Sequence, residues 1–288
     1  MSEVAASASN VAAVIDLHTH STVSDGSDSP ARVAELAGEA GLKAFALTDH
    51  DRLDGLAEAG ARAAELGVEL VPGCELSCEH PGTMHVLVYD VEAGEGPLQD
   101  ELVALQHARD TRNERMAERL AALGLPVTRE EMEAEAGGIG VGRPHVAAIL
   151  VRKGVVGSVQ EAFDVWLAKG RPAYVEKERL APADALRLAR ASGGRPVLAH
   201  PLSLGLDPPA LAAAVRELAD LGLCGIEAVY GRYTPSDRAG LVALAHKAGL
   251  VATGGSDHHG SYKPDLTVGT GTGDLAVPDE ALAALRAR

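Results

Sequence analysis

The sequence predicts an α/β barrel that is interrupted by a helical insertion. Two observations indicate this class. Short apolar segments alternate with helical patterns in the first and last thirds of the chain, and the residues between them show helical patterns almost throughout. With 288 residues, 46% hydrophobic and 23% charged, the chain can form one large core or a core with a small lobe.

The elements of the barrel follow in order along the chain. Ser29 before Pro30 predicts an N-cap with proline at the first helical position, and Gly41 predicts the end of that helix. A second helix is expected to end at Gly67. The barrel strands are expected at 14–17, 44–47, 68–71, 84–91, 196–199, 225–229 and 250–253. The remaining barrel helices are expected at 53–66, 208–221 and 236–248.

The middle of the chain predicts helices at 98–123, 129–136, 144–153 and 160–167, with a short strand at 173–175. We therefore expect a disordered tail at 1–13, a first part of the barrel at 14–91, a helical insertion at 92–190, and a second part of the barrel with a C-terminal tail at 191–288. Functional loops of an α/β barrel lie at the carboxyl ends of its strands. An insertion in such a loop is expected to cover those ends.

Composition excludes several classes of protein. Three cysteines are too few for a disulfide framework, and the first residues lack the basic segment of a signal peptide, so a cytoplasmic location is expected. No apolar run approaches the roughly 18 residues of a membrane span. A net charge of −15 and 3% aromatic residues argue against membrane and duplex DNA partners and against base-stacking platforms.

The charge is unevenly distributed along the chain. Residues 106–190 carry 14 of the 26 basic and 12 of the 41 acidic residues, a net charge of +2, whereas the remainder carries −17. Anion-binding side chains are therefore expected in the insertion. Four arginines of its long helix span more than one face, so we expect at least two of them to be solvated: Arg109, Arg112, Arg115 and Arg119.

Residues that commonly bind metals recur at the ends of the predicted barrel strands. His18 and His20 lie two apart on a strand, so they project to the same face, and Asp25 follows them. Later strands add His50, Glu75, His85, His200, Asp257 and His259. A single histidine at a strand end is an ordinary structural residue, but six histidines and three acids in this pattern indicate a metal centre.

Six short segments carry these residues, and a seventh, GIEAV, lies between the last two of them: HTHSTVSDGSDSP, LTDHD, GCELS, HVLVYDV, AHP and GSDHH. Together they resemble the polymerase-and-histidinol-phosphatase (PHP) superfamily of metal-dependent phosphoesterases, over about 16–90 and 195–260. The resemblance implies a distorted (β/α)7 barrel with three divalent ions, commonly manganese, with iron or zinc as alternatives, because such ligand sets discriminate little between these metals.

The resemblance also assigns the ligands. It implies a first ion held by His18, His20, Glu75 and Asp257. Glu75 would bridge to a second ion held by His85 and His200, and Asp25, His50 and His259 would hold the third. A hydroxide shared by ions about 4 Å apart would attack the phosphate, so no serine or cysteine nucleophile is expected. Ser21, Ser24 and Ser27 are expected in turns and caps.

The insertion narrows the choice within the superfamily. Residues 142–147 (GRPHVA) and 169–175 (KGRPAYV) resemble the branch that removes phosphate from nucleoside 3′,5′-bisphosphates, whose close relatives degrade 5′-phosphorylated RNA from its 5′ end. Arg143 at a helix start can bind a phosphate together with backbone N–H groups. The expected substrate-binding residues are Arg143, His145, Lys169 and Arg171.

Two positions depart from that branch. After Pro201 the chain reads Leu202-Ser203-Leu204 in place of a glycine and a basic residue, so one phosphate contact is expected to be missing. His258 replaces the apolar residue that is usual between the last two ligands, and spacing favours His259 as the ligand.

The expected activity is hydrolysis of the 3′-phosphate of a nucleoside 3′,5′-bisphosphate, with short 5′-phosphorylated RNA as a further substrate. Base preference and oligomeric state stay open. Alternatives are a histidinol-phosphate phosphatase, a cyclic-phosphate hydrolase, and a non-catalytic PHP module that serves as a scaffold or polymerase partner. The insertion argues against the first because an amino-alcohol phosphate needs no second-phosphate lobe. Nine intact ligands argue against the last.

Overall fold

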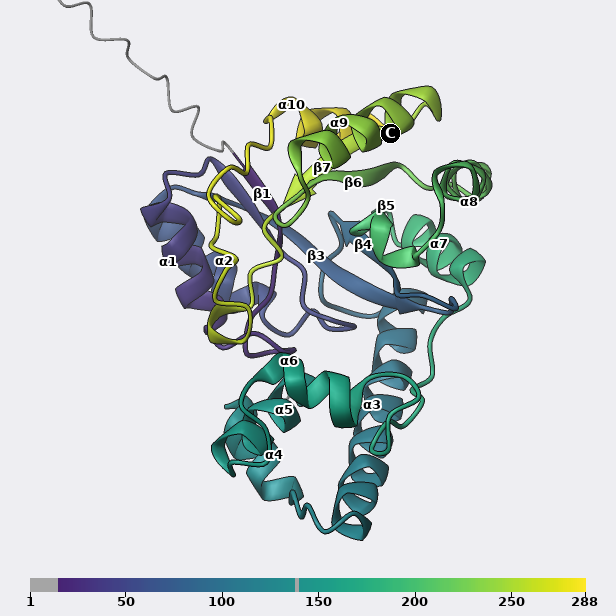
Figure 1. The fold of residues 1–288 in the computed structure, drawn as a ribbon. Coiled ribbons are helices and arrows are strands. Elements are labelled where there is room, and N and C mark those ends of the chain that lie inside the picture. Colours follow the sequence, from purple (N-terminus) through teal and green to yellow (C-terminus); the bar gives the residue numbers. More distant parts are fainter. Residues whose placement is uncertain (1–14, 138–139) are drawn as a thin grey trace, which may run out of the picture.

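Seven strands form one sheet that curls into a nearly closed barrel (Figure 1). The structure is a computed structural model that describes residues 15–137 and 140–288, so the expected tail at 1–13 lies outside the described residues. The strands neighbour one another in chain order: β1 Ile15–Thr19, β2 Ala44–Leu47, β3 Glu69–Cys78, β4 Met84–Tyr89, β5 Arg195–Leu198, β6 Gly225–Tyr230 and β7 Val251–Gly255. Just beyond β7, the Asp257 N–H donates to the His18 carbonyl of β1 (2.8 Å), which brings the two edges together. The expected α/β barrel is confirmed.

One strand of the barrel runs against the others. β4 pairs antiparallel with both β3 and β5, whereas the remaining neighbours pair in parallel. Residues 79–83 join β3 to β4 without a crossover helix, and a connection this short permits only antiparallel pairing. The start of β4 therefore lies at the same barrel end as the carboxyl ends of the parallel strands.

Helices cover the outside of the barrel, with α1 and α2 on one side and α7 and α8 on the other (Figure 1). These helices are α1 Pro30–Glu39, α2 Leu56–Leu66, α7 Pro182–Ala191, α8 Pro208–Asp220, α9 Pro235–Lys247 and α10 Glu280–Arg286. Ser29 caps α1 by accepting the Arg32 N–H, as its sequence predicts. Gly67 ends α2 at φ 69°, a conformation that favours glycine. Apolar side chains between sheet and helices form the main core.

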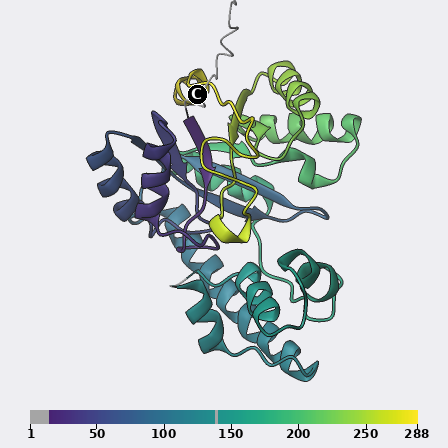
Figure 2. The same cartoon turned by 60° about the vertical axis from the view of Figure 1, so that its left-hand side comes forward.

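The insertion forms a second cluster of helices beyond one end of the barrel, as Figures 1 and 2 show. It contains α3 Pro97–Ala122, α4 Arg129–Ala136, α5 Arg143–Arg152, α6 Val159–Ala162 and a π-helical turn at Phe163–Leu167. Its own core includes Met116, Leu120 and Ile149. The expected helices are confirmed, but the expected strand at 173–175 is wrong because this segment pairs with no sheet.

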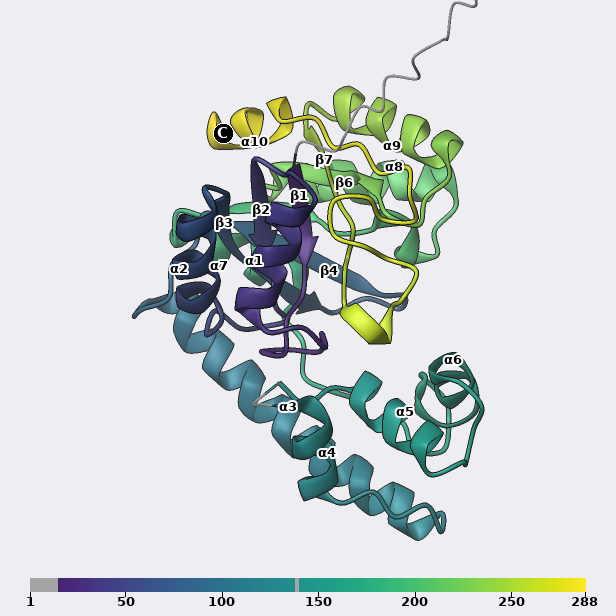
Figure 3. The ribbon, with the colours of Figure 1, turned by 90° about the vertical axis from the view of Figure 1, so that its left-hand side faces the viewer.

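The two cores are joined by α3, which runs from the barrel into the insertion (Figure 3). Leu98, Leu102 and Leu105 at its start pack in the barrel core, and Met116 and Leu120 near its end pack in the insertion core. Helix α7 also packs its apolar residues in the barrel core, although the division at residue 190 assigns it to the insertion. That division stays a prediction.

Within residues 15–137 and 140–288, we find no helix that combines the length and the apolar character needed to cross a membrane.

Candidate metal centre

His18 of β1, His20 just after it and two acids from other strand ends converge on one point inside the barrel mouth. His18 and His20 are both fully buried, and their Nε2 atoms lie 3.0 Å apart. Glu75 Oε2 is 3.4 Å from His18 Nε2 and 3.2 Å from His20 Nε2. Asp257 Oδ1 is 3.5 and 3.4 Å from the same two atoms. A tetrahedral ion with bonds of about 2.1 Å separates its ligands by about 3.4 Å, so these spacings fit a divalent metal.

The second oxygen of Glu75 contacts the histidines that are expected to hold a second ion. Glu75 Oε1 lies 2.9 Å from His85 Nδ1 and 3.1 Å from His200 Nε2. His85 reaches this end of the barrel because β4 runs antiparallel to its neighbours. Glu75 therefore faces both groups of ligands, as a bridging carboxylate must.

Asp25, His50 and His259 form a third group beside the first. Asp25 Oδ1 is 3.3 Å from His259 Nε2, and Asp25 Oδ2 is 3.9 Å from His50 Nε2. Donor atoms of these three residues and His20 all lie within 4.8 Å of one another. The structure thus brings all nine expected ligands to the same barrel end and adds His20 to the third group.

The electrostatics of the cluster suit cation binding. Burial lowers the pKa of His50 well below its ordinary value, which keeps the imidazole neutral and able to bind a metal. Burial alone would raise the pKa of Glu75, but the surrounding imidazoles, those of His50 and His85 first, hold it well below its usual range. His50 Nδ1 is buried and lies 3.1 Å from Glu75 Oε2, but it makes no hydrogen bond within the described part of the chain. An ion bound between this nitrogen and the carboxylate is one partner that would satisfy it.

Contacts behind the ligands fix their orientation. Tyr230 Oη and Lys263 Nζ both donate to Asp257 Oδ2 (2.7 and 2.5 Å), so Asp257 Oδ1 is left to face the ligand cluster. Ser21 and Ser24 donate their hydroxyls to the buried Asp49 (2.6 Å each). These serines therefore stabilise the loop after β1.

A cavity of about 150 Å³ opens from the metal ligands into the insertion. It is lined by Asp25, His50 and His85 of the ligand cluster and by five basic residues: Arg109, Arg112, Arg143, Lys177 and Arg179. The buried Asp51 pairs with Arg109 (2.8 Å) and Lys177 (2.6 Å). Burial, with the nearby charge of Arg109 and Arg143, lowers the pKa of Arg112 well below its ordinary value. The five basic side chains outnumber the acidic ones around this cavity. The excess positive charge favours a bound anion.

Comparison with known proteins agrees with this geometry. The PHP domain model matches residues 16–170. A 5′-3′ exoribonuclease Rnm from Escherichia coli (strain K12) is 32% identical over 254 residues, which cover 87% of this chain and 86% of that protein. A 3′,5′-nucleoside bisphosphate phosphatase from Chromobacterium violaceum is 31% identical over 265 residues, covering 88% of this chain and 90% of that protein.

The chain belongs to the PHP family.

A solved structure from Bifidobacterium adolescentis, assigned to the metal-dependent phosphoesterases, superposes with a TM-score of 0.84 at 28% identity and covers 94% of each chain. The expected class of enzyme, a PHP metal-dependent phosphoesterase, is confirmed.

Of the four expected substrate-binding residues of this PHP protein, only Arg143 lines the basic cavity. Its guanidinium lies over the rings of Phe163 and Tyr174 (5.6 and 5.8 Å to the centroids). His145 is fully buried and accepts the Gly142 N–H with Nδ1 (2.8 Å), so it orders the start of α5.

The other two expected residues lie farther out. Lys169 lines a neighbouring cavity of about 440 Å³ that shares Lys177 and Arg179 with the basic cavity. Arg171 is exposed and lines none of the cavities described here. Both stay predictions as substrate contacts.

Sequence reasoning missed the role of Lys177 and Arg179. Val175, Lys177 and Arg179 alternate along an extended segment, and all three line the cavity. Alternate residues of an extended segment project to the same side, so this spacing of two could have indicated both residues in the sequence. Of the four arginines of α3, Arg109 and Arg112 are buried, while Arg115 and Arg119 are exposed as expected for at least two of them.

The two departures from the family pattern have structural roles. His258 is buried between the Leu266 carbonyl (2.8 Å from Nδ1) and Asp28 Oδ2 (2.9 Å from Nε2) and lies outside the ligand cluster. Ser203 Oγ lies 2.8 Å from His200 Nδ1 and donates to the Thr83 carbonyl (2.8 Å). It therefore orients a metal ligand.

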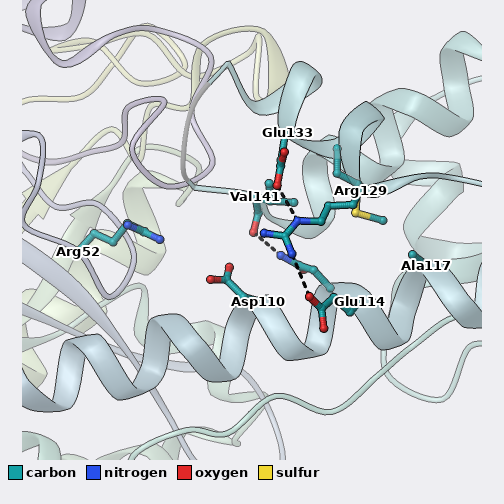
Figure 4. A pocket seen from close by; sticks show the side chains of 9 residues that line it. Arg52, Asp110, Glu114, Ala117, Arg129, Glu133 and Val141 are labelled. Carbon is teal, nitrogen blue, oxygen red and sulfur yellow. Dashed lines mark hydrogen bonds and ion pairs between the residues drawn. The ribbon is translucent and has the colours of Figure 1, made fainter.

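A separate cavity of about 400 Å³ lies between α3 and α4 (Figure 4). There Arg129 pairs with Glu114 (3.0 Å) and Glu133 (2.7 Å), and Asp110 adds a further negative charge. This cavity suits a phosphate less well than the basic one, because acidic side chains outnumber basic ones on its wall.

Proposed function

We propose that this protein removes the 3′-phosphate from nucleoside 3′,5′-bisphosphates, with short 5′-phosphorylated RNA as a second substrate class. The basic cavity that opens from the metal ligands carries this proposal, because a substrate with two phosphates can occupy both places at once. Relatives named for a nucleoside bisphosphate phosphatase and a 5′-3′ exoribonuclease support it.

Three divalent ions, most readily manganese, are part of the proposal. The nine donor side chains fit this set in type and spacing, since imidazoles and carboxylates suit first-row divalent metals. When bound, such ions polarise the phosphoryl group and activate water near neutral pH.

The protein's own residues then bind and orient the substrate. Arg112, Arg143 and Arg179 hold the phosphate that is not cleaved, through charge-assisted hydrogen bonds in a partly dry cavity. Lys177, held between Asp51 Oδ2 (2.6 Å) and Ser77 Oγ (2.9 Å), lies in the same cavity as His50 and His85 and contacts the substrate between its two phosphates.

Covalent catalysis by the chain is not needed. Ser21 and Ser24 are buried, with their hydroxyls hydrogen-bonded to Asp49, and neither lines the basic cavity, so neither can reach a substrate bound there. Burial raises the pKa of the Cys74 and Cys78 thiols, so neither forms the reactive thiolate.

An assay with added Mn²⁺ that measures free phosphate and also separates the nucleotide and sugar-phosphate products by chromatography tests the proposal. Its substrates are a nucleoside 3′,5′-bisphosphate, the matching 3′-monophosphate, histidinol phosphate, a ribosyl cyclic phosphate and a short 5′-phosphorylated RNA. The bisphosphate should give the highest kcat/KM, and chelation should abolish release. A preference for histidinol phosphate or the cyclic phosphate would overturn the substrate assignment, and release from none of them would favour the scaffold role.

The proposal includes a cytoplasmic location. Cys74, Cys78 and Cys224 are buried free thiols, as a reducing compartment favours. Cell fractionation checks this point.

A further inference from the structure

Glu227 on β6 is a fully buried carboxylate that the proposed chemistry does not use. Its Oε1 lies 2.9 Å from His18 Nδ1, and its Oε2 accepts the backbone N–H of His200 (2.7 Å). His18 is expected to hold the first ion and His200 the second. A single side chain therefore contacts ligands from two of the three groups.

The contact with His18 sets the chemical form of that ligand. Glu227 Oε1 accepts a hydrogen bond from His18 Nδ1–H, which leaves the lone pair of Nε2 directed toward His20, Glu75 and Asp257. A carboxylate behind a ligating imidazole fixes its tautomer and raises its basicity.

The contact with His200 supports an unusual backbone. His200 has φ 27° and ψ 64°, a conformation that a residue other than glycine rarely adopts. The bond from its N–H to Glu227 helps to hold that turn, which directs Nε2 to Glu75 Oε1 (3.1 Å). Ser203 Oγ accepts from His200 Nδ1 on the other side of the ring (2.8 Å).

Both contacts of Glu227 require an acceptor, since an imidazole N–H and a backbone N–H both donate. A carboxylate supplies two acceptor oxygens, whereas an amide supplies one and places an NH₂ group against the other donor. Glutamine has the same shape, but it cannot satisfy both partners.

We propose that Glu227 is a positioning residue that couples the first and second ion sites, so that loss of its charge weakens both while the third site is kept. This inference rests on the proposed three-ion centre. The third group, made of Asp25, His50 and His259, has no hydrogen bond or ion pair with Glu227 among the described residues.

The test measures metal binding in the full chain. Metal-free protein is dialysed against increasing Mn²⁺, and bound manganese is counted by elemental analysis for the wild type, Glu227→Gln, Ser203→Ala and Glu35→Gln. In E227Q two ions should bind at least tenfold more weakly, and the third should bind as in the wild type. S203A removes a hydroxyl that contacts His200 and no other expected ligand, so it should weaken one ion.

Glu35→Gln is the matched control. Glu35 on α1 is also a carboxylate whose two oxygens accept from different donors, Arg32 Nη1 (3.0 Å) and Arg62 Nε (3.1 Å), but it contacts none of the expected ligands. This variant makes the same change from carboxylate to amide and should keep the manganese content of the wild type.

The outcomes are distinct. E227Q that binds manganese like the wild type, or that loses a single ion, overturns the coupling. A wild type that binds no manganese overturns the proposed metal centre instead. Circular dichroism of the metal-free proteins checks folding. Should E227Q not fold, Glu227→Asp, whose shorter arm cannot reach both donors, is judged by the same criterion.

Discussion

The barrel and the insertion contribute to the site in different ways. All nine expected metal ligands come from the barrel, and the structure brings them together at one end. The insertion contributes the basic residues, and of the four that the sequence singles out there, only Arg143 lines the cavity. Strand ends place side chains by backbone pairing, whereas helices and extended segments place them by tertiary packing that local patterns do not encode. A chain can therefore keep its metal centre while the insertion changes the substrate.

Asp51 is the strongest link between the two regions, and its removal should have the largest effect. It is fully buried and pairs with Arg109 and Lys177 of the insertion, while its Oδ1 accepts the Ser77 N–H of the barrel (3.0 Å). Asp51→Ala leaves two buried cations unpaired, so the free energy of unfolding in urea should fall by about 3–5 kcal/mol. Ser77→Ala, which removes one hydrogen bond to Lys177, should cost about 1 kcal/mol. An equal loss of unfolding free energy in both variants would show that the ion pairs of Asp51 do not join the barrel to the insertion.

Within the barrel, Asp25→Asn tests the third group of ligands. We expect kcat for the bisphosphate to fall about a hundredfold or more, roughly 2.7 kcal/mol of barrier, because this group acts on charge that develops in the transition state. KM should change little. Steady-state kinetics with saturating Mn²⁺ measure both constants, and a kcat equal to that of the wild type would make this group dispensable.

Within the insertion, Arg112→Ala or Arg143→Ala should lower kcat/KM for a 3′,5′-bisphosphate by about 2–3 kcal/mol, the range for a lost charge-assisted contact. A 3′-monophosphate should react almost as before, because it never uses the contact. Arg171→Ala is the matched control, since Arg171 is exposed outside the cavity. If kcat/KM falls equally for both substrates, these arginines stabilise the fold and do not bind the second phosphate. A large fall of kcat/KM in R171A would show that Arg171 contacts the substrate after all.

The smallest expected effect is a pH dependence from Lys177. Burial lowers its pKa from 10.5 to about 7, so the ammonium donates to a phosphate below pH 7 and is lost above it. KM for the bisphosphate should therefore rise with pH above 7, by at most about tenfold per pH unit. Lys177→Arg keeps its charge and should give a KM that is flat between pH 6 and 9. A flat profile in the wild type would remove Lys177 from substrate binding.

The sequence predicts the barrel because each strand and helix has its own local signal. Ser29 and Pro30 mark the start of α1, and His18 and His20 lie two apart at the end of β1, His20 just beyond its last residue. It does not predict the direction of β4, because the nearly continuous apolar run of this strand is typical of a buried parallel strand. His85 was nevertheless expected at the site, and the reversal explains how the first residues of a strand reach it.

The basic cavity was predicted less well. The burial of Arg112 depends on how α5 and the segment at 173–180 pack against α3, which charge counting does not reveal. Ser203 illustrates the same limit of pattern comparison. Its position reads as a missing phosphate contact in sequence, yet its hydroxyl orients His200.

Helix α3 fixes where two of the basic side chains lie. Its first turns pack in the barrel core and its last turns in the insertion core, and Arg109 and Arg112 lie on the stretch between them. A continuous α-helix rises about 1.5 Å per residue and resists compression, so these two side chains keep a set height above the barrel. Under the proposed function, a molecule whose two phosphates span from the expected metal ligands to these arginines is held at both ends, and a shorter or longer one is held at a single end.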